Sequence, residues 1–148
     1  KLGQFIRQRR NNFQFLYKNL QPLSKYLALP EPTENSNPSW FGFSVRVKKN
    51  SPIRRNEIVQ SLNERNIGTR LLFGGNLTKQ PFYKGFNSRI SGKLHSTDSI
   101  MNDVFWLGVQ PNLTEKMKKF VVTQLTEIFT KEDIYVWKQA DHRFWNGQ

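Results

Sequence analysis

Cysteine is absent from this sequence of 148 residues, which excludes disulfides, thiolate metal sites and a cysteine nucleophile within the chain. No stretch approaches the roughly 18 apolar residues that span a bilayer, and the residues after Lys1 lack the apolar centre of a signal peptide. The two histidines, His95 and His142, stand at no metal-ligand spacing, and no P-loop or nucleophile-elbow motif occurs. We therefore expect a cytoplasmic chain with no metal site, no membrane association and no catalytic residue of its own.

Acidic residues are also scarce, with 11 against 23 basic residues and a formal net charge of +12. Such a charge favours a polyanionic partner, with nucleic acid as the first candidate and phosphorylated small molecules behind it. The basic residues are spread thinly, however, and no segment matches the signature of a common RNA-binding module. A basic nucleic-acid-binding module therefore stays an alternative interpretation of the charge.

Hydrophobic periodicity predicts one α+β domain, in which helices pack on a short β-sheet. Helices are expected over three segments: 2–20, from an N-cap at Ser51 to Gly68, and from a capping box at Asn112 and Glu115 to about residue 129. Strands are expected over 39–48, 69–73 and 104–109. The segment 82–94 has little aliphatic content and is expected to cross the surface as a long irregular excursion.

The strand expected over 39–48 alternates apolar and polar residues. Phe41, Phe43, Val45 and Val47 fall on the apolar face, so the residues alone favour a core position for Phe41 and Phe43. Trp106, inside the apolar run over 104–109, is expected in the core as well.

The segment 68–83 is the candidate binding loop, because a glycine pair interrupts it and polar side chains follow. Gly74 and Gly75 lack a Cβ, which allows positive φ and a close approach of backbone to a ligand. Asn76 and Gln80 offer donors and acceptors, and Arg70 offers a fixed fork of donors. A solvated connection is the alternative that composition favours.

Three segments resemble the C-terminal part of the sugar aminotransferase and dehydratase family of vitamin B6 enzymes: Ser-Trp-Phe-Gly-Phe from Ser39, Ile-Gly-Thr-Arg-Leu-Leu-Phe-Gly-Gly-Asn from Ile67, and Met-Asn-Asp-Val-Phe-Trp-Leu-Gly-Val-Gln-Pro from Met101. The resemblance covers residues 1–131 and leaves 132–148 as a tail of unknown role. Within the family it is strongest to the 3-dehydrases of CDP-linked 4-keto-6-deoxyhexoses, which act in deoxysugar and lipopolysaccharide O-antigen biosynthesis. An aminotransferase domain is the alternative within the family.

The resemblance implies the small C-terminal domain of a fold type I enzyme, inactive without its large cofactor domain. It implies pyridoxamine or pyridoxal phosphate in that large domain, and allows an iron–sulfur cluster there. The expected partners are a nucleotide-sugar substrate, a flavin and iron–sulfur reductase that supplies electrons, and a second subunit in a homodimer.

The same resemblance implies roles for particular residues. Phe41 falls where the aminotransferases tend to have a histidine that faces the cofactor, so it is expected to face the cofactor here. Five residues are expected on the substrate side, with Arg70 pairing to diphosphate oxygens: Arg70, Gly74, Gly75, Asn76 and Gln80.

Overall fold

A four-stranded antiparallel sheet forms the centre of the fold in the computed structural model, which describes residues 1–130. The helices are α1 (Leu2–Leu20), α2 (Arg55–Glu64), α3 (His95–Asp103) and α4 (Glu115–Glu127). The strands are β1 (Leu27–Ala28), β2 (Gly42–Val47), β3 (Thr69–Leu71) and β4 (Val104–Gly108). Short 3₁₀ helices are η1 (Gln21–Leu23), η2 (Leu77–Lys79) and η3 (Pro81–Tyr83). The tail predicted over 132–148 lies outside the described residues.

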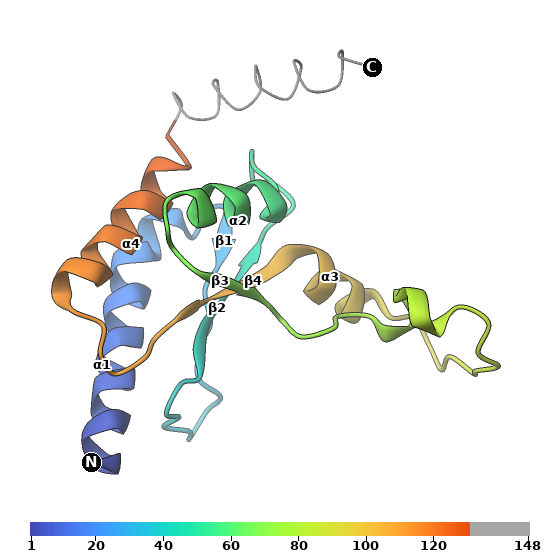
Figure 1. Ribbon diagram of the computed structural model, residues 1–148, viewed down its shortest axis with the longest axis horizontal. Coiled ribbons are helices and arrows are strands. Elements are labelled where there is room, and N and C mark those ends of the chain that lie inside the picture. Colours follow the sequence, from blue (N-terminus) through green and yellow to red (C-terminus); the bar gives the residue numbers. More distant parts are fainter. Residues whose placement is uncertain (131–148) are drawn as a thin grey trace.

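The strand order β1-β2-β4-β3 places β4 between β2 and β3. Both neighbours run antiparallel to β4, so they run parallel to each other, and β2, α2 and β3 form a split β-α-β unit. This topology brings nearly all of β2 and the whole of β3 next to β4, although they lie far apart in the sequence (Figure 1).

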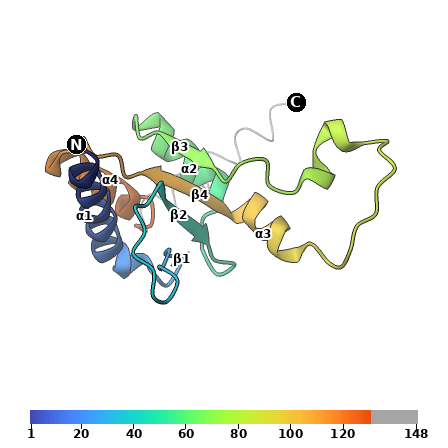
Figure 2. The same cartoon turned by 90° about the horizontal axis from the view of Figure 1, so that it is seen from below.

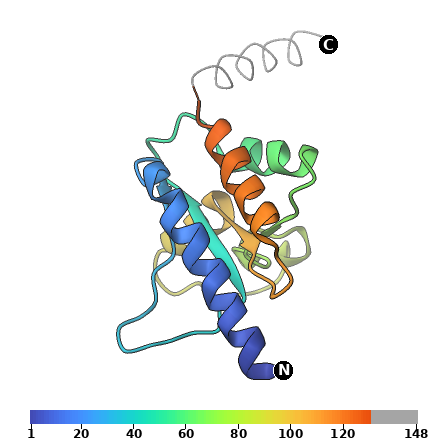
Figure 3. The same cartoon turned by 90° about the vertical axis from the view of Figure 1, so that its left-hand side faces the viewer.

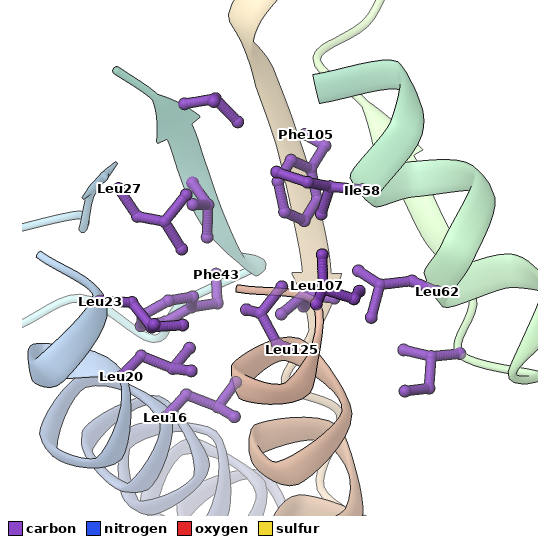
Figure 4. Close-up of a cluster of buried hydrophobic side chains, with 14 of the residues drawn as sticks. Leu16, Leu20, Leu23, Leu27, Phe43, Ile58, Leu62, Phe105, Leu107 and Leu125 are labelled. Carbon is purple, nitrogen blue, oxygen red and sulfur yellow. The ribbon is translucent and has the colours of Figure 1, made fainter. Parts of the chain in front are cut away.

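Three helices, α1, α2 and α4, cover the same face of the sheet, and α1 and α4 lie side by side (Figure 3). The core fills the space between these helices and the sheet (Figure 4). Its largest fully buried side chains include Phe13, Phe43, Phe105, Leu16 and Ile58. Periodicity predicted this layer correctly, because the apolar stripes of α1 and α4 and the alternate residues of β2 and β4 converge here.

Helix α1 has the predicted bounds, and its stripe is buried only in the second half. Phe13, Leu16 and Leu20 are buried in the core, whereas Leu2 and Phe5 are exposed. The first turns project beyond the sheet, as Figure 3 shows. No helix among residues 1–130 is long and apolar enough to cross a membrane.

Two helix starts differ from the prediction. Helix α2 begins at Arg55 because the Ser51 hydroxyl bonds within a turn, accepting from the Ile53 N–H (3.3 Å) and donating to the Ile53 carbonyl (2.7 Å). Helix α4 is capped by Thr114, whose hydroxyl accepts from a first-turn N–H (3.2 Å), so Asn112 stays outside it. Thr114 thus takes the capping role expected of Asn112, whereas the N-cap of α2 is Arg54, whose backbone N–H donates to the Glu57 carboxylate (2.5 Å).

One α-helix and one strand were not predicted, and the end of α2 was placed wrongly. Helix α2 ends at Glu64 instead of at Gly68, and the left-handed Asn66 (φ 60°) turns the chain away from the helix axis. Helix α3 consists largely of residues with low helix propensity, and its last carbonyls accept from the Arg55 guanidinium, at 2.8 Å for Met101 and 3.0 Å for Asn102. Because this stabilising contact comes from a distant residue, local sequence could not reveal α3. Strand β1 is only two residues long.

The predicted excursion is confirmed. Between η3 and α3 the chain forms no helix or strand, and it extends away from the layered part of the domain (Figure 2).

Candidate functional site

The sheet face turned away from α1, α2 and α4 carries one row of side chains across three strands. Ser44 of β2 lies directly opposite Trp106 of β4, and Trp106 lies directly opposite Arg70 of β3. Directly opposed residues of antiparallel strands point to the same side of the sheet. We call Phe41, Gly42, Ser44, Arg70 and Trp106 the outer-face cluster.

Phe41 and Trp106 are in contact on this outer face, which corrects the expectation that both are core residues. Their ring centroids are 4.9 Å apart, Phe41 is 69% exposed and Trp106 is half-buried. The strand begins only at Gly42, so the alternation that buries Phe43 does not extend back to Phe41. The aromatic pair therefore presents apolar surface to whatever lies against this face.

Gly42 makes room for the Trp106 ring. A Cβ at residue 42 would lie 2.0 Å from Cε3 of Trp106, far inside van der Waals contact. The ring is held in place by its Nε1–H, which donates to the Leu71 carbonyl of the neighbouring strand (3.2 Å). The indole thus fills the space over Gly42 and adds a side-chain hydrogen bond between β4 and β3.

We predict that Gly42→Ala displaces the Trp106 ring. The added methyl group forces the indole out of its rotamer, and the expected destabilisation is about 1–3 kcal/mol, as for other overpacked sites. Urea unfolding measures the loss of stability, and a red shift of the tryptophan emission reports the displacement of the ring. Gly68→Ala is the matched control, since a Cβ there has no heavy atom within 4 Å. Equal stability of the two variants would contradict this account of Gly42.

Arg70 is exposed, and within residues 1–130 its side chain makes no hydrogen bond or ion pair. Arg70 therefore forms no surface ion pair within the described part of the chain. Arg70 and Trp106 also line a cavity of about 600 Å³ that continues along β3 to the first turns of α4. A guanidinium without a partner next to an aromatic pair can bind an oxyanion bidentately.

Gly74, Gly75 and Gln80 lie elsewhere, around a smaller cavity of about 150 Å³ next to α3. Gly75 has φ +61°, and a Cβ on it would lie 2.6 Å from Cγ of Met101. The missing Cβ therefore serves packing of the loop on α3. Gln80 donates from Nε2 to the Gly74 carbonyl (2.7 Å) and closes the loop on itself.

Asn76 is buried, only 2% exposed, which corrects the expectation that it faces a substrate. Its Nδ2 donates to Oδ1 of Asp98 (2.6 Å), and its Oδ1 accepts from the N–H (3.1 Å) and hydroxyl (2.7 Å) of Thr78. The amide is thus used inside the chain, to cap η2 and to hold α3.

Asp98 is the residue here that sequence reasoning missed. Besides Asn76 it pairs with the Lys79 ammonium (2.9 Å). The hydrogen bond from Asn76, followed by Lys79, lowers the pKa of Asp98 below its ordinary value, and His95 adds a smaller effect in the same direction. A prediction of helix α3 from the sequence would have been needed to place Asp98 next to the loop. Residues 1–130 hold no group of three or more potential metal ligands.

The lowered pKa of Asp98 predicts a pH dependence of the loop over 74–80. Since the folded pKa lies below the unfolded one, the stabilisation is complete above about pH 4 and is lost as the pH falls through the folded pKa. Amide hydrogen exchange in this loop, corrected for intrinsic rates, should stay constant from about pH 7 to 5 and accelerate below about pH 4. Asp98→Asn should exchange faster throughout and lack the acid step; a step that persists in this variant would contradict the assignment.

Comparison with known proteins identifies relatives of the chain. The lipopolysaccharide biosynthesis protein RfbH of Salmonella typhimurium is 45% identical over 129 residues, which are 87% of this chain and 30% of that protein. The dTDP-4-dehydro-2,6-dideoxy-D-glucose 3-dehydratase of Saccharopolyspora spinosa is 39% identical over 131 residues, 88% of this chain and 28% of that protein. The chain thus spans about 30% of the length of these curated relatives.

A solved structure has the same fold. GDP-4-keto-6-deoxymannose-3-dehydratase with a trapped PLP–glutamate geminal diamine aligns with a TM-score of 0.73 at 25% identity, over 84% of this chain and 32% of that one. The match confirms the expected α+β fold, the small domain of PLP-dependent transferases. A family model matches residues 1–126 and confirms the resemblance seen in the sequence. The chain belongs to the DegT/DnrJ/EryC1/StrS aminotransferase family.

Proposed function

We propose that this chain is the C-terminal small domain of a vitamin B6-dependent 3-dehydratase that removes the 3-hydroxyl of a CDP-linked 4-keto-6-deoxyhexose, for deoxysugar and lipopolysaccharide synthesis. The relatives that support this are named as 3-dehydratases of nucleotide-linked keto sugars or as a lipopolysaccharide biosynthesis protein. The observation that supports it most directly is the position of Arg70. Its exposed guanidinium has no partner within residues 1–130 and lies beside Trp106 and Phe41.

In this proposal the outer-face cluster is one wall of the substrate site. Arg70 binds the diphosphate, because its planar fork of donors matches two oxygens at once. Trp106 and Phe41 supply an apolar wall that excludes water, which strengthens the ionic contact beside it. Gly74, Gly75 and Gln80 shape the following loop, and Asn76 anchors it from inside.

The described residues fit the cofactor only as part of its surroundings. Phe41 offers it an aromatic face, while these residues contain no buried cluster of donors that could enclose a phosphate group on all sides. Pyridoxamine phosphate, when bound, supplies the electron sink that loosens the bond next to the keto group. We propose that a large domain outside this chain holds the cofactor and has room for an iron–sulfur cluster. A flavin and iron–sulfur reductase and a second subunit in a homodimer are the proposed partners of the full-length enzyme.

Phe41 favours elimination over amino transfer. A phenyl ring can neither accept nor donate a proton, whereas a histidine at this position could serve as an acid or base. We propose that Phe41 keeps water and proton donors away from the cofactor side of the site. The main competing function is that of a sugar aminotransferase, which transfers the amino group to the sugar. One assay that follows the amino group therefore distinguishes the two functions.

The test uses the full-length enzyme with pyridoxamine phosphate and CDP-4-keto-6-deoxyglucose, with and without glutamate. A 3-dehydratase yields a product that has lost one water, as mass spectrometry detects, without net consumption of the amine. Phe41→His is expected to lower the elimination rate, and Phe5→His on α1 is the control outside the cluster. Accumulation of an amino sugar together with glutamate consumption would instead establish the aminotransferase.

A further inference from the structure

The loop that follows β3 is fixed to α3 at two points. Asn76 donates from Nδ2 to Oδ1 of Asp98 (2.6 Å), and Gly75 lies against Met101 without room for a Cβ. Asp98 and Met101 are three residues apart in α3, so they lie on one face of that helix. The loop over 74–80 is therefore docked on α3.

The exit of the chain from β3 is sharply bent. Phe73 has φ +52° with its side chain 85% exposed, a conformation that a bulky residue keeps only when its flanks hold it. On one flank the Leu71 carbonyl accepts from the Phe73 N–H (2.9 Å) and from the Trp106 indole (3.2 Å). On the other flank the Asn76 amide binds Asp98. The Asp98 contact therefore acts on the turn that begins right after β3.

Strand β3 has little else to hold it. It is three residues long and lies at the edge of the sheet, and within residues 1–130 β4 is its only partner strand. Short edge strands fray easily, because only one row of hydrogen bonds holds them. Helix α3 runs directly into β4, so Asp98 and Trp106 belong to one continuous segment. The bond to Asp98 thus anchors β3 a second time to the segment that carries Trp106.

We propose that Asp98 is a positioning residue for the substrate site. Through Asn76 it holds the loop over 74–80, and thereby keeps Arg70 beside Trp106, where the guanidinium binds the diphosphate. This inference rests on the proposed function, which gives Arg70 that task. Removing the carboxylate should raise the KM for the nucleotide-sugar about tenfold, comparable to the loss of one charge-assisted hydrogen bond, and change kcat less than about twofold.

The experiment compares Asp98→Ala and Asp98→Asn in the full-length holoenzyme. Asp103→Asn is the matched control, because Asp103 lies on the same helix and accepts from the Ser99 hydroxyl (2.8 Å) without contacting the loop. The measurements are KM and kcat, the Kd for CDP, dTDP and GDP by calorimetry, and hydrogen exchange of the peptide over 70–80. We expect weaker nucleotide binding and faster exchange in the Asp98 variants alone.

Nucleotide binding and hydrogen exchange separate this inference from the proposed function. A parent enzyme that binds a nucleotide diphosphate but eliminates no water refutes the dehydratase proposal and leaves the role of Asp98 testable. Equal nucleotide affinity in the parent and Asp98→Ala refutes the positioning role, and so does a parallel fall of kcat and affinity.

An exchange variant keeps the inference testable if Asp98→Ala does not fold. In Asn76→Asp combined with Asp98→Asn, the hydrogen bond can form with donor and acceptor reversed. We expect the double variant to recover nucleotide affinity to within about threefold of the parent, beyond what either single variant retains. No recovery would contradict the assignment.

Discussion

Arg70→Ala is expected to raise the KM for the nucleotide-sugar about 100-fold and to leave kcat within a few-fold of the parent value. A bidentate pair to a diphosphate makes two charge-assisted hydrogen bonds, and losing them costs about 2.7 kcal/mol, or two factors of ten. The effect should fall on KM because the diphosphate is remote from the reacting carbon and is bound equally before and during the reaction. Steady-state kinetics of the full-length enzyme measure both constants.

Two control variants sharpen this prediction. Arg70→Lys keeps the charge and loses the fork, so it should recover only part of the affinity. Arg46→Ala removes an exposed arginine from β2 that pairs with Val104 instead of Trp106, and should change KM less than about twofold. An unchanged KM in Arg70→Ala, or an equal rise in Arg46→Ala, would remove Arg70 from the proposed site.

Phe43→Ala is expected to destabilise the protein by about 3–5 kcal/mol, the usual range for a fully buried phenylalanine. Phe43 is completely buried on β2, its ring centroid lies 5.0 Å from that of Phe13 on α1, and Leu107 of β4 is its cross-strand partner. The deletion therefore leaves a cavity where the helix layer meets the sheet. The midpoint of urea unfolding, with an unchanged m-value, measures the loss.

The matched control is Phe82→Ala, which removes a ring that is 63% exposed. It should change the stability by no more than about 0.5 kcal/mol. A loss of similar size in both variants would mean that the core does not lie where the buried residues place it.

The helix layer and the two longest strands were predictable because their signals are local. The apolar stripe of α1 predicts a helix, and the apolar run of β4 predicts a strand, from residues close together in the sequence. Helix α3 was not predictable, since the Arg55 guanidinium that caps it lies more than 40 residues away in sequence. Alternation misplaced Phe41 for a related reason: the Trp106 ring that receives it comes from another strand.

For the candidate site, the sequence indicates the exposure of a side chain best where that side chain points outward from a strand. Arg70 lies in an exposed position opposite Trp106, and its binding of a diphosphate stays a prediction. Asn76 also offers a donor and an acceptor, but its amide is hydrogen-bonded to Asp98 and Thr78 inside the chain. The sequence therefore predicts that a polar side chain after two glycines makes hydrogen bonds. It does not say whether the bonding partner is a ligand or another residue of the protein.

The most direct measurement is a crystal structure of the full-length enzyme with a non-reactive CDP-linked 6-deoxyhexose bound. Our account predicts that the Arg70 guanidinium donates two hydrogen bonds to the diphosphate, with Trp106 and Phe41 against the same ligand or the cofactor. A ligand bound away from the outer-face cluster, with Arg70 paired to a carboxylate of the protein itself, would contradict it.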